Sequence, residues 1–175
     1  VFPTSVEEND VVGCRTIVAR KKENAGSDYA LIRLDRAVVG RRPLAINRSG
    51  DLRVGDKIGV IGHPSGLPTK VAFGESKVRD LSPAAYFVAN LDTYGGNSGS
   101  AVFNATTGLI EGILVRGERD FVTENGCRMS KTCTADECRG EDVTKISELA
   151  IMIPEPGTRK PPGSKWPTLG RRPKP

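Results

Sequence analysis

The chain is cut by glycine and proline into short apolar segments, and this punctuation limits its fold more than any other feature. Segments rich in β-branched and aromatic residues predict strands at 11–19, 28–35, 57–62, 70–74, 76–80, 85–91, 101–103 and 109–115. Asn104-Ala105-Thr106-Thr107-Gly108 is a hairpin signal between the last two. Because no helical pattern separates these segments, they predict an all-β barrel or sandwich.

One helix is expected near the C-terminus. Apolar residues recur there at intervals of three and four, at Val143, Ile146, Leu149, Ala150 and Ile153. Two prolines, Pro154 and Pro156, then end the pattern. Residues 36–55 hold several arginines together with Pro43, Gly50 and Gly55, and we expect an exposed connection there. The chain of 175 residues suits one domain, over residues 1–153.

Residues 154–175 differ in composition from the rest of the chain. Six of the 26 basic residues but only one of the 21 acidic residues lie there, so the net charge of +5 belongs to this tail and residues 1–153 are neutral overall. The many prolines predict a disordered tail. A neutral domain with 5% aromatic residues offers no basic groove or stacking platform, so we expect no nucleic-acid partner. No apolar run approaches the ~20 residues of a membrane-spanning helix, so we expect no membrane partner.

The four cysteines are Cys14, Cys127, Cys133 and Cys138. A zinc site would need Cys14 as its fourth ligand, and one or two disulfides in a secreted or otherwise extracytoplasmic protein are the simpler interpretation. Three complete pairings are open, and Cys14 also fits a partner upstream. We expect an oxidised loop over 127–138 close to residues 115–117, with no metal and no cofactor.

Ser98 lies among three glycines, in Asp92-Thr93-Tyr94-Gly95-Gly96-Asn97-Ser98-Gly99-Ser100. Glycines around one hydroxyl group indicate a backbone shape that a Cβ atom would obstruct. Such a turn can direct two backbone N–H groups into one concavity, as an anion site requires. The same composition also fits a turn between two strands.

Two motifs resemble those of serine endopeptidases of the trypsin/chymotrypsin type. Asp28-Tyr29-Ala30-Leu31-Ile32 resembles the segment around the triad aspartate, although Asp28 alone also fits a turn aspartate. Residues 95–100 resemble the segment around the nucleophilic serine. Over roughly residues 11–153 the chain most resembles the bacterial trypsin-like branch that includes the glutamyl endopeptidases. The resemblance implies a chymotrypsin-like double β-barrel with a C-terminal α-helix, an acyl-enzyme on Ser98, and an oxyanion hole formed by the N–H groups of Gly96 and Ser98.

The chain departs from this family in its histidine. The family places the base histidine before the aspartate, but residues 1–27 contain none, and the only histidine is His63, in a turn where we expect a structural role. We therefore expect an N-terminally truncated chain with an incomplete first barrel, apolar surface exposed where the missing strands would pack, and no catalytic competence. The first residue, Val1, is typical of a processed or truncated product. An inactive, protease-like binding module is the alternative.

The resemblance also indicates a substrate site, for a polypeptide bound by a monomer. It places Asp92 at the floor of the primary specificity pocket and Val115-Arg116-Gly117 on the strand that pairs with substrate. A carboxylate at that floor would favour arginine or lysine side chains, unless the nearby Arg116 and Glu118 neutralised or redirected it. Asp92 as a turn residue bonded to local N–H groups is the alternative.

Overall fold

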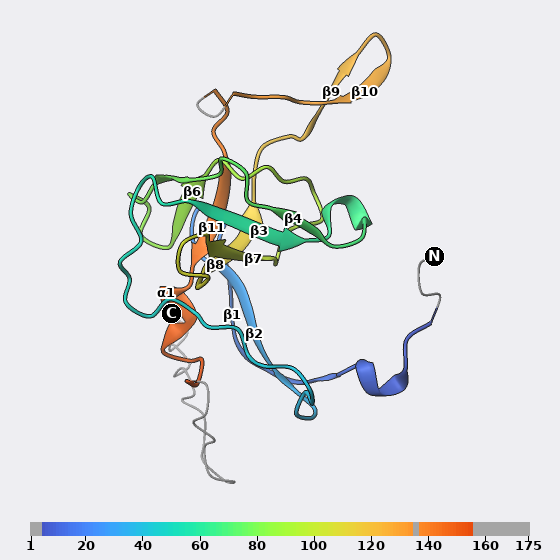
Figure 1. Ribbon diagram of the computed structural model, residues 1–175, viewed down its shortest axis with the longest axis vertical. Helices are drawn as coiled ribbons and strands as arrows, with labels where there is room; N and C mark the ends of the chain where they lie inside the picture. Colours follow the sequence, from blue (N-terminus) through green and yellow to red (C-terminus); the bar gives the residue numbers. More distant parts are fainter. Residues whose placement is uncertain (1–4, 135–136, 156–175) are drawn as a thin grey trace, which may run out of the picture.

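The computed structural model describes residues 5–134 and 137–155. Its main body is a seven-stranded antiparallel sheet in the order β4-β3-β7-β8-β11-β6-β5 (Figure 1). These strands are β3 (Ile58–Gly62), β4 (Lys70–Ala72), β5 (Val78–Asp80), β6 (Tyr86–Ala89), β7 (Ala101–Asn104), β8 (Ile110–Arg116) and β11 (Glu141–Lys145). Two short 3₁₀ turns, η1 (Glu8–Asp10) and η2 (Pro64–Gly66), lie outside the sheet. The described part is nearly all-β, as predicted.

One core holds this sheet together. It consists of Ile58, Val60, Val78, Phe87, Ala89, Leu91, Val102, Leu114 and Val143. In β6 the buried Phe87 and Ala89 alternate with half-buried neighbours, which is the period-two pattern of a strand with one face on the core. The core therefore fixes the register of the strands that carry the candidate site.

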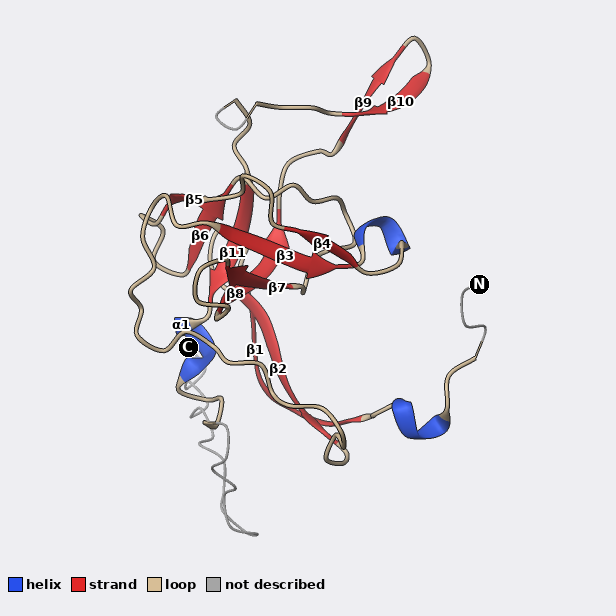
Figure 2. Ribbon diagram, viewed as in Figure 1, coloured by secondary structure: helices blue, strands red, loops and turns tan. Residues whose placement is uncertain are grey.

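A separate two-stranded sheet precedes this body. It pairs β1 (Cys14–Lys22) with β2 (Asp28–Leu34) and extends away from the seven-stranded sheet in Figure 2. Its paired Ile17 and Ile32 are 53% and 45% exposed. Two strands cannot close a barrel, so the first barrel is incomplete in this chain and leaves apolar surface uncovered, as expected.

The expected C-terminal helix is much shorter than its apolar spacing indicates. Only α1 (Ser147–Ala150) is helical, and Val143 belongs to β11, where it pairs with Phe87 and Leu114. The helical spacing arose because a strand residue and the residues of the following turn fall on one repeat. Pairing of β11 with two neighbouring strands outweighs this local pattern.

Two features of the connecting segments were not predicted from the sequence. The connection over 36–55 is mostly exposed, but Asn47 is buried and Ile46 forms a parallel bridge with Ile110 of β8. Residues 121–130, which include the first cysteine of the expected loop over 127–138, form the hairpin of β9 (Phe121–Glu124) and β10 (Cys127–Ser130). Its turn residues Asn125 and Gly126 have φ values of 50° and 76°, the conformation that an Asn-Gly hairpin turn requires.

The cysteines form one disulfide, between Cys133 and Cys138. Cys14 and Cys127 are free and exposed. An oxidised pair in this loop was expected, and its formation uses two of the sulfur atoms that a zinc site would need. Within residues 5–134 and 137–155, the structure contains no helix whose length and apolar character would let it cross a membrane.

Candidate active site

The turn between β6 and β7 has the backbone shape that its glycines indicate. Gly96 and Gly99 have φ values of 100° and 93°, in the region that favours glycine. A Cβ atom on Gly96 would lie 2.9 Å from the backbone nitrogen of Ser65 and 3.2 Å from the carbonyl oxygen of His63. Gly96 is therefore required both for its conformation and for the close approach of the His63–Ser65 turn.

The two peptides that flank Gly95 are each held by one hydrogen bond. The N–H of Gly95 donates to Oδ2 of Asp120 at 2.7 Å, and the N–H of Ser65 donates to the carbonyl oxygen of Gly95 at 2.7 Å. The carbonyl and N–H of a trans peptide point in opposite directions. The N–H of Gly96 therefore points away from Ser65, in an orientation that folding has already fixed.

Ser98 presents an exposed side chain at the end of this turn. Its Oγ lies 3.5 Å from the carbonyl oxygen of Val115, at the long end of hydrogen-bond range. The next residue is tied more firmly, since the N–H of Gly99 donates to the carbonyl of Leu114 at 2.7 Å. The turn is thus anchored to β8 while the Ser98 hydroxyl group stays accessible.

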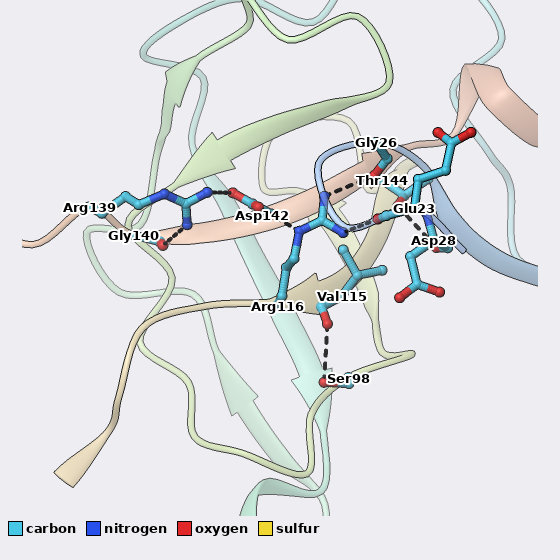
Figure 3. Close-up of polar contacts among 10 residues, drawn as sticks. All are labelled: Glu23, Gly26, Asp28, Ser98, Val115, Arg116, Arg139, Gly140, Asp142 and Thr144. Carbon is cyan, nitrogen blue, oxygen red and sulfur yellow. Dashed lines mark hydrogen bonds and ion pairs between the residues drawn. The ribbon is translucent and has the colours of Figure 1, made fainter. Parts of the chain in front are cut away.

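Asp28 is docked on the main sheet through its backbone. Its N–H donates to Oγ1 of the buried Thr144 at 3.1 Å, and this hydroxyl group donates back to the Asp28 carbonyl at 3.0 Å. Thr144 pairs with Ile113 of β8. Asp28 and Ser98 are therefore anchored within two residues of each other along β8, and Figure 3 shows both beside this strand.

The structure separates the predicted substrate residues, because Asp92 lines two neighbouring cavities and the described residues 115–117 line neither. Asp92 is exposed and lines both, one of about 380 Å³ with Tyr94 and Phe121 and one of about 490 Å³. Within the described part of the chain, no residue of 115–117 is among those lining either cavity. Gly117 nevertheless contacts Glu141, which does line the larger one.

The side chains expected to neutralise Asp92 have other partners. Arg116 pairs with the buried Asp142, with Nε 2.8 Å from Oδ2. Glu118 pairs with Lys131 at 3.0 Å, and this ion pair lowers the pKa of Glu118 through its hydrogen bond. These contacts remove the reason to expect Arg116 or Glu118 to redirect Asp92.

Glu141 is a cavity residue that the sequence did not reveal. Its carboxyl group occupies the space that a side chain at position 117 would fill. Burial raises the pKa of Glu141 to about 7, helped by the charges of Asp120 and Asp142 and opposed by Arg139. It follows the cysteine loop in a polar stretch, so no apolar period or motif pointed to it.

The side chain of His63 is bonded within its own turn. Nδ1 lies 3.1 Å from the carbonyl oxygen of Leu67, and Nε2 lies 3.4 Å from Oγ1 of Thr69. The backbone of the same turn supports the Gly95–Gly96 peptide through Ser65. Sequence reasoning assigned His63 a structural role but did not indicate this contact with the serine turn.

The two adjacent glycines provide a matched test of the turn. Gly96→Ala should destabilise the fold by about 1–3 kcal/mol, because alanine disfavours this φ and its Cβ meets the Ser65 backbone. Gly95→Ala should change stability by only about 0.5 kcal/mol, because its Cβ would meet only Oδ2 of Asp120, at 3.4 Å. Denaturant unfolding of both variants measures this, and equal losses would contradict the fixed turn.

Glu141 should make stability depend on pH. Its pKa is raised in the fold from 4.5 to about 7, so the folded state holds a proton that the unfolded state has lost between these values. Stability should fall as pH rises through this window. Glu141→Gln should therefore match the wild type at pH 4 and exceed its melting temperature at pH 8. The exposed Glu75→Gln is the control, and an equal gain there would refute the role of burial.

Comparisons with known proteins identify the fold. The structure is similar to the active form of the Rv3671c protease of M. tuberculosis, with a TM-score of 0.54 and 14% identity over 84% of this chain and 61% of that one. An inactive serine-to-alanine form of that protease gives a TM-score of 0.49 and 14% identity over 77% of this chain and 60% of that one. The chain thus spans about three-fifths of those structures, and at this identity the likeness concerns the fold alone.

No curated protein sequence matches the chain. The profile of the trypsin-like peptidase domain matches residues 3–113, more than half of the chain, and the chain therefore belongs to this family.

Proposed function

We propose that the chain is the larger part of a serine endopeptidase domain that cleaves polypeptides through an acyl-enzyme on Ser98. The observation that carries this proposal is the Gly95–Gly96 peptide: Ser65 binds its carbonyl oxygen, so its Gly96 N–H is directed away from Ser65, and Asp120 holds the preceding N–H of Gly95. A preorganised donor beside an exposed serine hydroxyl is the arrangement that acyl transfer needs. Family membership makes a peptidase the relevant chemistry.

The proposed mechanism assigns one task to each group. The Ser98 hydroxyl group attacks the substrate carbonyl and gives its proton to a histidine. Asp28 orients that histidine and stabilises its protonated form. The N–H groups of Gly96 and Ser98 bind the resulting oxyanion, and each donor contributes about 3 kcal/mol of barrier lowering. The histidine later returns the proton to the leaving amine.

In this proposal the base histidine lies outside these 175 residues. No histidine precedes Asp28, and both ring nitrogens of His63 face groups of its own turn. The uncovered apolar face of β1 and β2, with Ile17 and Ile32, is where further strands of the first barrel would pack. The same lack of a histidine favours the second candidate, an inactive protease-like binding module.

Catalysis should depend on the segment that carries the histidine. The 175-residue chain should show no peptidase turnover and no useful labelling by a serine-directed phosphonate, because Ser98 keeps its proton without a base. Protein expressed from the complete gene should be labelled, and Ser98→Ala should abolish labelling. His63→Ala should leave it unchanged. Loss of activity in His63→Ala would mean that the triad uses His63, and no labelling of the complete protein would favour the binding module.

Substrate choice should follow the acidic cavity. We propose that Asp92 favours arginine or lysine before the cleaved bond, because the charge of the exposed carboxylate attracts a cationic side chain. Asp92→Asn should lower kcat/KM for such peptides by about tenfold while changing it little for peptides with alanine at that position. A peptide panel measures this. A preference for glutamate would place Asp92 outside the specificity pocket and favour the glutamyl endopeptidase branch.

A further inference from the structure

Arg116 is a side chain of the seven-stranded sheet that binds the two-stranded sheet by two hydrogen bonds. It lies at the end of β8, and its guanidinium group reaches the loop that joins β1 to β2 (Figure 3). Nη1 donates to the carbonyl of Glu23 at 3.2 Å, and Nη2 donates to the carbonyl of Gly26 at 2.8 Å. This loop leads directly into Asp28.

The guanidinium group is itself held in place from the main sheet. Nε donates to Oδ2 of Asp142 at 2.8 Å, and the side chain of Asp142 is only 3% exposed. Arg139 binds the other oxygen of the same carboxylate. The guanidinium carbon also lies 5.1 Å from the centre of the Tyr86 ring, within cation–π range. A planar fork fixed at one edge presents its remaining donors in a defined direction.

Two more contacts hold the same loop. Oγ of the buried Ser27 donates to Oε2 of Glu148 at 2.5 Å, and the Asp28 backbone exchanges hydrogen bonds with Thr144. Arg116 binds the early part of the loop, whereas Glu148 and Thr144 bind its end. With Arg116 removed, the loop would keep its end contacts but lose the support that sets its direction of approach.

Position along β8 connects this anchor to the nucleophile. Ser98 approaches the carbonyl of Val115, and the side chain of the next residue, Arg116, binds the Asp28 loop. A displacement of this strand end would move both groups together. We propose that Arg116, fixed by Asp142, is a positioning residue that sets Asp28 relative to Ser98 across the two sheets. This inference rests on the proposed function.

The role differs from binding the substrate through the Arg116 side chain. Its donors are directed to Asp142 and to two loop carbonyls, so the guanidinium group acts inside the fold. Arg116→Ala should therefore lower kcat by about 10²-fold, the usual effect of a misplacement near 1 Å, and leave KM within about twofold.

The test uses protein expressed from the complete gene. Arg36→Ala is the matched control, because Arg36 also donates to backbone carbonyls, those of Asn9 and Val11, but at the opposite end of the hairpin from Asp28. Arg116→Lys should restore little activity, since one ammonium cannot replace the fork. Arg36→Ala should keep its kcat. Millimolar guanidinium should raise the kcat of Arg116→Ala and leave that of Arg36→Ala unchanged. A merely structural role would not produce this selective rescue.

A second measurement covers variants that fold poorly. Hydrogen exchange at the Glu23 amide, which donates to the Ser27 carbonyl in the part of the loop that Arg116 binds, should lose protection in Arg116→Ala and in Asp142→Asn, while the amides of β3 and β7 keep theirs. If Ser98-dependent activity exists and Arg116→Ala matches Arg36→Ala in kcat, the positioning role is overturned and the proposed function stands. If no activity depends on Ser98, the proposed function fails and the positioning role fails with it.

Discussion

The backbone of β8 is the constraint on which the rest of the structure depends. It pairs with β7 on one side and β11 on the other, and both pairings carry the core. At Gly112, β8 passes close to β11, and a Cβ atom there would come within 2.3 Å of the Thr144 carbonyl oxygen. This close approach places Thr144, and with it the Asp28 backbone, at a set distance from the strand.

The serine turn and the Asp28 loop meet this strand in different ways. The turn joins by backbone hydrogen bonds, from Gly99 to Leu114, which need only regular strand geometry. The loop joins by side chains, those of Thr144, Arg116 and Glu148, each reaching it from the main sheet or its C-terminal extension. Alignment of the two halves is therefore encoded in side chains far from the motifs that carry the proposed chemistry.

This difference explains what sequence reasoning could predict. The strand pattern and the glycine positions are local properties, so the all-β fold and the constraint at Gly96 followed from short windows of sequence. The pairing of β11 and the partners of Arg116 depend on residues far apart in the chain. Val143 was consequently placed in a helix, and Arg116 was considered only as part of the substrate-pairing strand and as a neighbour of Asp92. The β9–β10 hairpin had a local signal, Asn125-Gly126, which the cysteines around it obscured.

The uncovered hairpin has a consequence for how a complete site would assemble. The Asp28 end of β1 and β2 is fixed to the main sheet through Thr144 and Arg116, whereas Ile17 and Ile32 lie exposed along the strands. Strands packing on that apolar face would gain burial without breaking the contacts that hold Asp28. In the proposed mechanism, a segment that carries the histidine would therefore meet Asp28 and Ser98 already anchored beside β8, and its binding energy would be available for ordering the imidazole.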